Sequence, residues 1–241
     1  MVHPLGENVD TVEGKPHRSG GRPTREDAAA LDSLVLTAAR RVFCESGYTK
    51  ASMDQVAAAI GGSKLTIYRR YRSKSALLEA LVDHDLARLV ATMSQPSESG
   101  DPLRALRAGA QALFEFSIEP ENICFSTFLL AEARLMGDLR EKFEQWERIA
   151  LGPLESLIRE AQALQQLRAG ASAPILSVLV DLINGSAQRM RSYRGDIFDG
   201  LMPADYFAAR WDVFIRAMVP ANNREDYQHL PIMASLESRT R

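Results

Sequence analysis

Apolar residues recur along most of this chain at intervals of three or four positions, which is the spacing of a helix face that packs against a core. No stretch alternates between apolar and polar residues for long enough to predict a sheet. The pattern therefore predicts an all-α protein of about nine or ten helices. Two short helices are expected within Ser52–Lys74, and longer ones at residues 25–46, 73–93, 102–119, 122–136, 138–165, 174–193 and 203–219.

Glycine and proline mark the breaks between these segments. Residues 1–21 are rich in Gly, Pro and polar residues and have no apolar period, so we expect a disordered arm that is not a secretory signal. Gln95–Gly100 and Ala169–Pro174 are predicted to be loops. Gly152–Pro153 should bend or interrupt the helix expected at 138–165, because proline lacks an N–H donor and clashes with the preceding turn.

The segment Ser52–Lys74 holds the densest set of local signals in the chain. Ser52 is a good N-cap, and Gln55, three residues later, can complete a capping box. Gly61–Gly62 ends this helix, because glycine adopts positive φ at little cost, and Ser63 can cap the next helix. The segment is therefore predicted to fold as helix, tight turn and helix.

The second of these short helices is basic. Its polar and cationic residues are Lys64, Thr66, Tyr68, Arg69 and Arg70, with Arg72 and Lys74 just beyond it. Leu65 and Ile67 are expected to face inward or to brace the turn. A short basic helix on an apolar support places side chains in the major groove of DNA, and a Tyr beside Thr and several cations suits phosphate contacts. The alternative is a solvated helix end with an ordinary basic face.

These elements resemble the AcrR-like DNA-binding domain of the TetR family of bacterial transcriptional repressors over about Asp27–Asp85. The matching elements are Val56-Ala57, Gly61-Gly62-Ser63, Thr66-Ile67-Tyr68 and Tyr71-Arg72-Ser73-Lys74, preceded by LVLTAARRVFCESGYTKAS. Gly62 stands where the family usually has Val, which is expected to loosen the packing of the turn. Leu65 stands where a small residue is usual, which is expected to change how closely the helix approaches DNA.

The resemblance implies a helix-turn-helix DNA-binding domain at residues 25–85 and an effector-binding and dimerisation domain at 86–219, with an arm at 1–24 and a tail at 220–241. The expected contacts to a double-stranded operator are Arg22, Arg25, Ser52, Ser63, Lys64, Leu65, Thr66, Tyr68, Arg69, Arg70 and Lys74. Lys74 is expected to touch a phosphate rather than a base. The Arg-bearing arm can enter the minor groove or remain a solvated tail.

Charge is distributed unevenly along the chain. From Lys15 to Lys74, twelve Lys and Arg residues oppose five Asp and Glu residues, a net of +7, and residues 1–14 carry −3. The net charge of −2 for the whole chain then leaves −6 for residues 75–241. A basic end on an acidic body suits a DNA-reading head joined to a regulatory body. Contacts of Lys and Arg with phosphates should make the affinity strongly salt-dependent.

The body is where the resemblance implies an effector pocket and a dimer interface. The pocket candidates are Phe114, Phe128, Trp146, Met190 and Trp211, each of which can equally be ordinary core. The two last long helices are implied to form a four-helix bundle across a two-fold axis, and the alternative is that their apolar faces pack on the rest of the body. The interface candidates are Leu176, Val180, Ile183, Met190, Tyr206, Val213, Phe214 and Ala217.

The function implied is that of a homodimeric repressor released from its operator by a small apolar effector. The alternatives are that the body binds a protein partner, or that the protein activates transcription. A small molecule that binds the body should stabilise it against heat, whereas a protein partner should co-purify with it.

The sequence offers no signature of an enzyme. There is no H-E-x-x-H, G-x-S-x-G or phosphate-loop motif, and the four His residues are far apart. Cys44 and Cys124 are 80 positions apart, so no disulfide framework, metal site or cofactor is implied. Two free thiols fit a reducing bacterial cytoplasm, where the protein would associate with the nucleoid. One thiol could sense redox state, but the apolar neighbours of Cys44 favour an inert core thiol. No apolar run is long enough to span a membrane.

Overall fold

The computed structural model describes residues 24–94, 100–192, 198, 200–223 and 227, and of residues 186–192 it describes the backbone alone. These residues form nine α-helices and no strand, so the predicted all-α class is confirmed. The arm before Thr24, which includes Arg22, lies outside the described residues. The helices are α1 (Arg25–Lys50), α2 (Met53–Ala59), α3 (Lys64–Arg70), α4 (Lys74–Met93), α5 (Pro102–Ile118), α6 (Pro120–Leu135), α7 (Gly137–Ala163), α8 (Ser172–Ser192) and α9 (Pro203–Met218).

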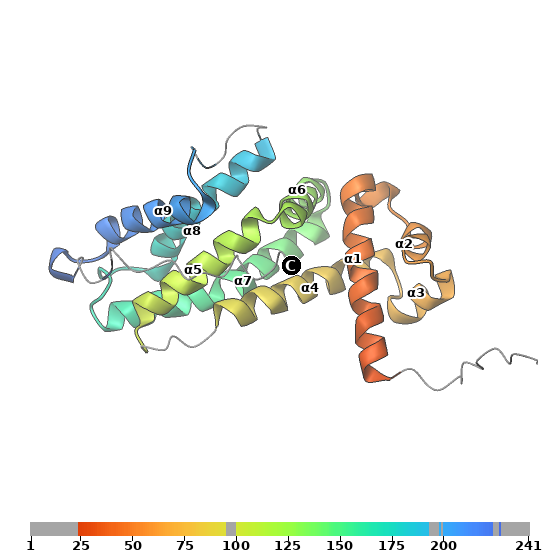
Figure 1. Ribbon diagram of the computed structural model, residues 1–241, viewed down its shortest axis with the longest axis horizontal. Helices are drawn as coiled ribbons and strands as arrows, with labels where there is room; N and C mark the ends of the chain where they lie inside the picture. Colours follow the sequence, from red (N-terminus) through yellow and green to blue (C-terminus); the bar gives the residue numbers. More distant parts are fainter. Residues whose placement is uncertain (1–23, 95–99, 193–197, 199, 224–226, 228–241) are drawn as a thin grey trace, which may run out of the picture.

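The molecule is elongated, with a small head at one end and a larger body at the other (Figure 1). Helices α1, α2 and α3 form the head, and α5 to α9 form the body. Helix α4 begins beside the head and runs into the body, so it belongs to both (Figure 1). Helix α3 lies on the side of the head that faces away from the body.

Two apolar cores hold the molecule together. One lies in the body and is built around Leu106, Phe114, Leu154, Trp211 and Phe214. The other begins in the head, from α1 to the first half of α4, and continues into α6 and α7. The head is therefore packed directly against the body rather than joined to it by a bare linker.

Local signals at the helix ends behave largely as predicted. Helix α1 begins after Thr24, which forms a capping box with Asp27. It kinks at Gly47, where φ is 72°, directly after the predicted end of this helix at Ser46. Helix α7 continues through Pro153, so the predicted interruption does not occur, and the bend at this point stays a prediction.

Candidate nucleic-acid interface and ligand cavity

Helices α2 and α3 are joined by the predicted tight turn. The Ser52 hydroxyl accepts from the Gln55 N–H, and the Gln55 side chain accepts from the Ser52 N–H, which completes the predicted capping box. At the other end of α2, Gly61 has a φ of 62°, and the Gly62 N–H donates to the Ala57 carbonyl at 2.9 Å. This is a Schellman motif, which needs a left-handed residue at the position of Gly61.

The space left by Gly62 is filled from within the turn. A Cβ atom at this position would lie 3.0 Å from Cδ1 of Ile60. The half-buried side chain of Ile60 therefore occupies the room that a larger residue at position 62 would take. The start of α3 is fixed by Ser63, whose hydroxyl accepts from the Thr66 N–H at 3.1 Å.

Helix α3 buries one side chain and exposes most of the others. Ile67 is fully buried, whereas Leu65 and Tyr68 are 69% and 42% exposed. The prediction that Leu65 faces inward or braces the turn is therefore wrong. Residues 65 and 67 are two positions apart and point about 200° apart around a helix, so burying Ile67 turns Leu65 outward. Leu65 is an apolar group at the centre of an otherwise polar surface.

The three cations of α3 lie in two different environments. Lys64 contacts Asp54 of α2 at 2.9 Å, with both side chains about 60% exposed, and this contact raises the pKa of Lys64. Arg69 is exposed on the same helix. Arg70 instead pairs with Asp32 of α1, which also accepts from the Tyr71 hydroxyl at 3.3 Å. Arg70 therefore holds α3 on α1, a role that sequence reasoning missed.

Lys74 also has an internal role that the sequence did not reveal. Its ammonium group donates to the carbonyls of Tyr48, Thr49 and Ala51, and it lies 4.4 Å from the centre of the Tyr48 ring. These carbonyls belong to the C-terminal end of α1, where a helix carries partial negative charge. Lys74 thus ties the start of α4 to the end of α1, and its donors are occupied in the absence of DNA.

The body contains a cavity of about 240 Å³ next to the head. Its wall is mainly apolar, from Val82, Leu86 and Leu89 of α4 to Phe125 and Leu129 of α6. Trp146 is the pocket candidate that lines it. The other aromatic candidates do not: Phe114 and Trp211 pack in the body core.

Phe128 belongs to the head core, where its ring stacks on Phe43 of α1 with centroids 5.7 Å apart. The side chain of Met190 lies outside the described residues. Sequence reasoning also missed Phe125, Phe116 and Phe143, which supply aromatic wall to the cavity. Because α5, α6, α7 and α9 all carry aromatic residues, their presence in the sequence did not indicate which helix faces would line a cavity.

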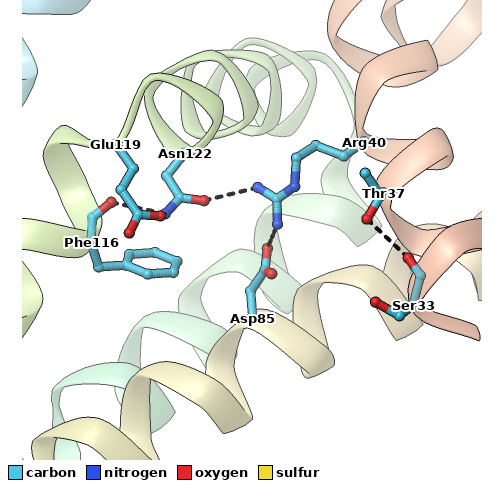
Figure 2. A network of polar contacts seen from close by, with 7 residues as sticks. All are labelled: Ser33, Thr37, Arg40, Asp85, Phe116, Glu119 and Asn122. Carbon is cyan, nitrogen blue, oxygen red and sulfur yellow. Dashed lines mark hydrogen bonds and ion pairs between the residues drawn. The ribbon is translucent and has the colours of Figure 1, made fainter. Parts of the chain in front are cut away.

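Polar groups at the head end of the cavity form a buried network with Arg40 of α1 (Figure 2). Arg40 pairs with Asp85 of α4 and donates to Oδ1 of Asn122 of α6 at 2.9 Å. The Arg40 guanidinium also lies 4.8 Å from the centre of the Phe125 ring. Asn122 in turn donates to the Phe116 carbonyl and to Glu119, each at 2.9 Å. Burial raises the pKa of the Asp85 carboxyl, and the charge of Arg40 opposes that rise.

Most of the predicted dimer-interface residues are buried within the subunit. Leu176, Ile183, Tyr206 and Phe214 are all less than a tenth exposed, and Val180 lines the cavity. These residues pack on the rest of the body, which is the alternative that the sequence left open. The exposed candidates are Val213 and Ala217 of α9.

Comparison with known proteins relates the head to one family. Residues 35–81 match the family described as bacterial regulatory proteins of the tetR family. This range covers the buried half of α1, the α2–turn–α3 unit and the start of α4.

The head of the chain matches the TetR family.

Individual transcriptional regulators match part of the chain. A transcriptional activator of Mycolicibacterium smegmatis, FasR, is 33% identical over 101 residues, which are 42% of this chain and 45% of FasR. A transcriptional repressor of Mycobacterium tuberculosis, Rv1474c, is 38% identical over 72 residues, which are 30% of this chain and 38% of the repressor. The chain thus spans less than half the length of these relatives.

The fold of the body agrees with TetR-family structures. A regulator of this family from Mesorhizobium loti superimposes with a TM-score of 0.64 at 19% identity, covering 82% of this chain and all of that protein. At this identity the similarity concerns the fold alone. The match to a family of DNA-binding regulators agrees with the expectation that the chain is not an enzyme.

Two further observations concern ligands and membranes. Among residues 24–94, 100–192 and 200–223, no group of three or more His, Cys, Asp and Glu residues is arranged to hold a metal ion. In the same part of the chain, no helix combines the length and the apolar character that a membrane span requires.

Proposed function

We propose that two copies of this chain bind an operator through α3, and that a small molecule in the body cavity changes their affinity for DNA. The observation that carries this proposal is the position of Arg40. It lies on the helix that supports α2 and α3, and its partners Asp85 and Asn122 line the cavity. A ligand that moves either partner therefore acts on the DNA-reading head.

The exposed face of α3 is suited to the major groove. Lys64 and Arg69 supply cations, and the Tyr68 hydroxyl supplies a donor for phosphate or base edges. Leu65 offers no hydrogen bond, but its exposed methyl groups can pack against the C5-methyl of thymine, which lies in the major groove. Arg25, Ser52 and Ser63 are exposed at helix starts of the head and remain proposed phosphate contacts.

The cavity favours an effector that is mostly apolar but donates a hydrogen bond. Its volume of about 240 Å³ is below the range of roughly 300–1,000 Å³ typical of drug-sized ligands, which points to a small molecule. Asp85 Oδ1 and Asn184 Oδ1 are buried atoms of residues that line it, and neither has a hydrogen-bond partner. A buried acceptor without a donor is unfavourable by about 1–3 kcal/mol, so a ligand donor at either atom would strengthen binding.

The proposed dimer uses the outward faces of α8 and α9. Val178 of α8 is 38% exposed and Val213 of α9 is 49% exposed, with Ala217 one turn further along. An isologous contact between two such faces would place two α3 helices on successive half-sites.

The proposal must also state whether the protein represses or activates transcription. FasR is named as an activator and Rv1474c as a repressor, and both resemble part of this chain. We favour repression, because occupation of an operator by a dimer is sufficient to block transcription. A reporter gene placed behind the selected operator would test this choice: repression requires lower expression when the protein is present.

The DNA-binding half of the proposal is tested by selecting binding sites from random duplex DNA. Affinity for the selected site, measured by fluorescence anisotropy, should fall steeply with salt. Lys64→Met should reduce the slope of log affinity against log salt by about 0.9 if Lys64 neutralises one phosphate. Arg159→Met, on the exposed surface of α7, serves as the control and should change neither affinity nor slope. Failure to select any sequence at low salt would overturn the assignment.

The effector half is tested with pairs of small aromatic compounds. Thermal-shift measurements would compare phenols and anilines with analogues in which the donor is methylated. Donor-bearing compounds should stabilise the protein more, and Asn184→Leu should reduce that preference if Asn184 receives the donor. Equal stabilisation by both members of every pair, or by neither, would contradict the proposed ligand chemistry.

A further inference from the structure

The two cysteines of the chain, 80 positions apart in sequence, meet at the junction of head and body. Cys44 lies on α1 and Cys124 on α6, and the two side chains lie close enough for the Cys124 thiol to raise the pKa of Cys44. Both line one surface depression, which is also lined by Arg41, Glu45 and Glu121. The sequence had suggested two isolated thiols, so this pairing is a product of the tertiary structure.

Contacts on both sides hold the two helices together at this point. Arg40, one turn before Cys44, donates to Asn122, two residues before Cys124. Phe43 stacks on Phe128, one turn after Cys124. The thiols are therefore bracketed by a buried hydrogen bond and an aromatic stack, so they stay close together in the folded protein.

The two thiols differ in their accessibility. Cys124 is exposed, whereas Cys44 is half-buried. Burial and the neighbouring Cys124 thiol raise the pKa of Cys44 to about 12. Cys124 is therefore the thiol that an oxidant in solution reaches first, and Cys44 is the partner held beside it.

We propose that Cys44 and Cys124 form a reversible disulfide that joins the head to the body and lowers the affinity for DNA. A hydroperoxide first oxidises the exposed thiol: Cys124-SH and ROOH give Cys124-SOH and ROH. The sulfur of Cys44 then attacks the sulfenic sulfur, forming the S–S bond and releasing water that carries the proton of Cys44. A reduced dithiol reverses the reaction by thiol–disulfide exchange.

The effect on DNA follows from the position of the bond, and it rests on the proposed DNA-binding function of the head. A disulfide has an S–S length of about 2.05 Å, which is shorter than any contact between unbonded sulfur atoms. Its formation draws the second half of α1 toward α6. Because α1 supports α2 and α3, both heads of a dimer shift relative to their half-sites. Disulfides in reducing compartments are usually transient and redox-sensing, which fits such a role.

The test uses the full-length protein, dilute and reduced, and hydrogen peroxide as the oxidant. After remaining thiols are blocked with N-ethylmaleimide, a digest without reductant should contain a Cys44–Cys124 cross-linked peptide. Cys44→Ser should stop at a Cys124 sulfenic acid that dimedone traps, and Cys124→Ser should remain unmodified under the same dose. Absence of the cross-link, or a linkage only between chains, would overturn the proposal.

The regulatory effect is measured on a duplex selected with the reduced protein. Oxidation should lower its affinity at least fivefold, and dithiothreitol should restore it. The double variant Cys44→Ser/Cys124→Ser, treated identically, should keep its affinity and so controls for oxidation of the eight methionines. A cross-linked protein whose affinity is unchanged or higher would refute the regulatory role. Failure of the reduced protein to bind any duplex would instead refute the DNA-binding function, since the cross-link is detected without DNA.

Discussion

Replacing Arg40 by methionine removes the charge that compensates a buried carboxylate. The side chains of Arg40 and Asp85 are 10% and 8% exposed, and they pair at the junction of α1 and α4 (Figure 2). Removing one partner of such a pair typically costs about 3–5 kcal/mol, because the other charge is left buried. Methionine keeps most of the volume of the arginine stem, so the loss reports mainly on charge and hydrogen bonding.

The loss should depend on pH in a direction fixed by Asp85. Burial already raises the pKa of this carboxyl, and without Arg40 its folded-state pKa rises further above the unfolded value. A carboxyl with a raised folded pKa destabilises the protein increasingly as pH rises from the unfolded pKa to the folded one. The deficit relative to the wild type therefore grows between the folded-state pKa of Asp85 in the wild type and that in the variant, by up to about 1.4 kcal/mol per pH unit. The variant should therefore be closer to the wild type at pH 5.5 than at pH 7.5.

Urea unfolding followed by circular dichroism at both pH values measures the effect at one fixed protein concentration. Arg159→Met is the matched control, since its partner Glu155 and Arg159 itself are 33% and 58% exposed. An exposed pair of this kind should contribute less than about 1 kcal/mol. The double variant Arg40→Met/Asp85→Asn should recover part of the loss. The reasoning is refuted if Arg40→Met and the control lose equal stability, or if the deficit of Arg40→Met does not change with pH.

Three further predictions test other parts of the structure. Lys74→Met should lower the free energy of unfolding by about 1–2 kcal/mol, because the carbonyls at the end of α1 lose their donor, and an unchanged urea midpoint would contradict this. Burial and Asp32 raise the pKa of Tyr71 to about 12, above its unfolded value. The stability that Tyr71 contributes is therefore complete below about pH 10 and is lost as the pH rises from about 10 to about 12. Tyr71→Phe should remove this part of the alkaline loss, as seen in urea midpoints at pH 9 and 11. Val213→Glu should shift the protein toward monomer in sedimentation velocity, whereas Leu34→Glu, equally exposed but in the head, should not.

The local architecture of the head could be predicted because it is encoded by neighbouring residues. Ser52 with Gln55, and Gly61 with Gly62, fix the ends of α2 through contacts that span three to five positions. Such contacts depend on little beyond the chain segment itself. The same is true of the helical period, from which the all-α class followed.

The faces of the helices were harder to predict than their ends. Leu65 and Ile67 were both expected to face inward or to brace the turn, but only Ile67 is buried. Phe114 and Trp211 were proposed for a cavity that is lined by other aromatic residues. An apolar residue can serve a core, a cavity or an interface equally well, and the choice among these depends on which helices pack against it.

The sequence by itself determined the helices, the caps and turn of the DNA-reading unit, and the family to which this unit belongs. The tertiary structure decided what joins that unit to the rest of the molecule. Arg40 of α1 contacts Asp85 of α4 and Asn122 of α6, which are 45 and 82 positions away in the sequence. Cys44 of α1 likewise lies beside Cys124 of α6. The helical period and the capping contacts involve residues a few positions apart. They carry no information about partners that are distant in the sequence and meet only when the helices pack together.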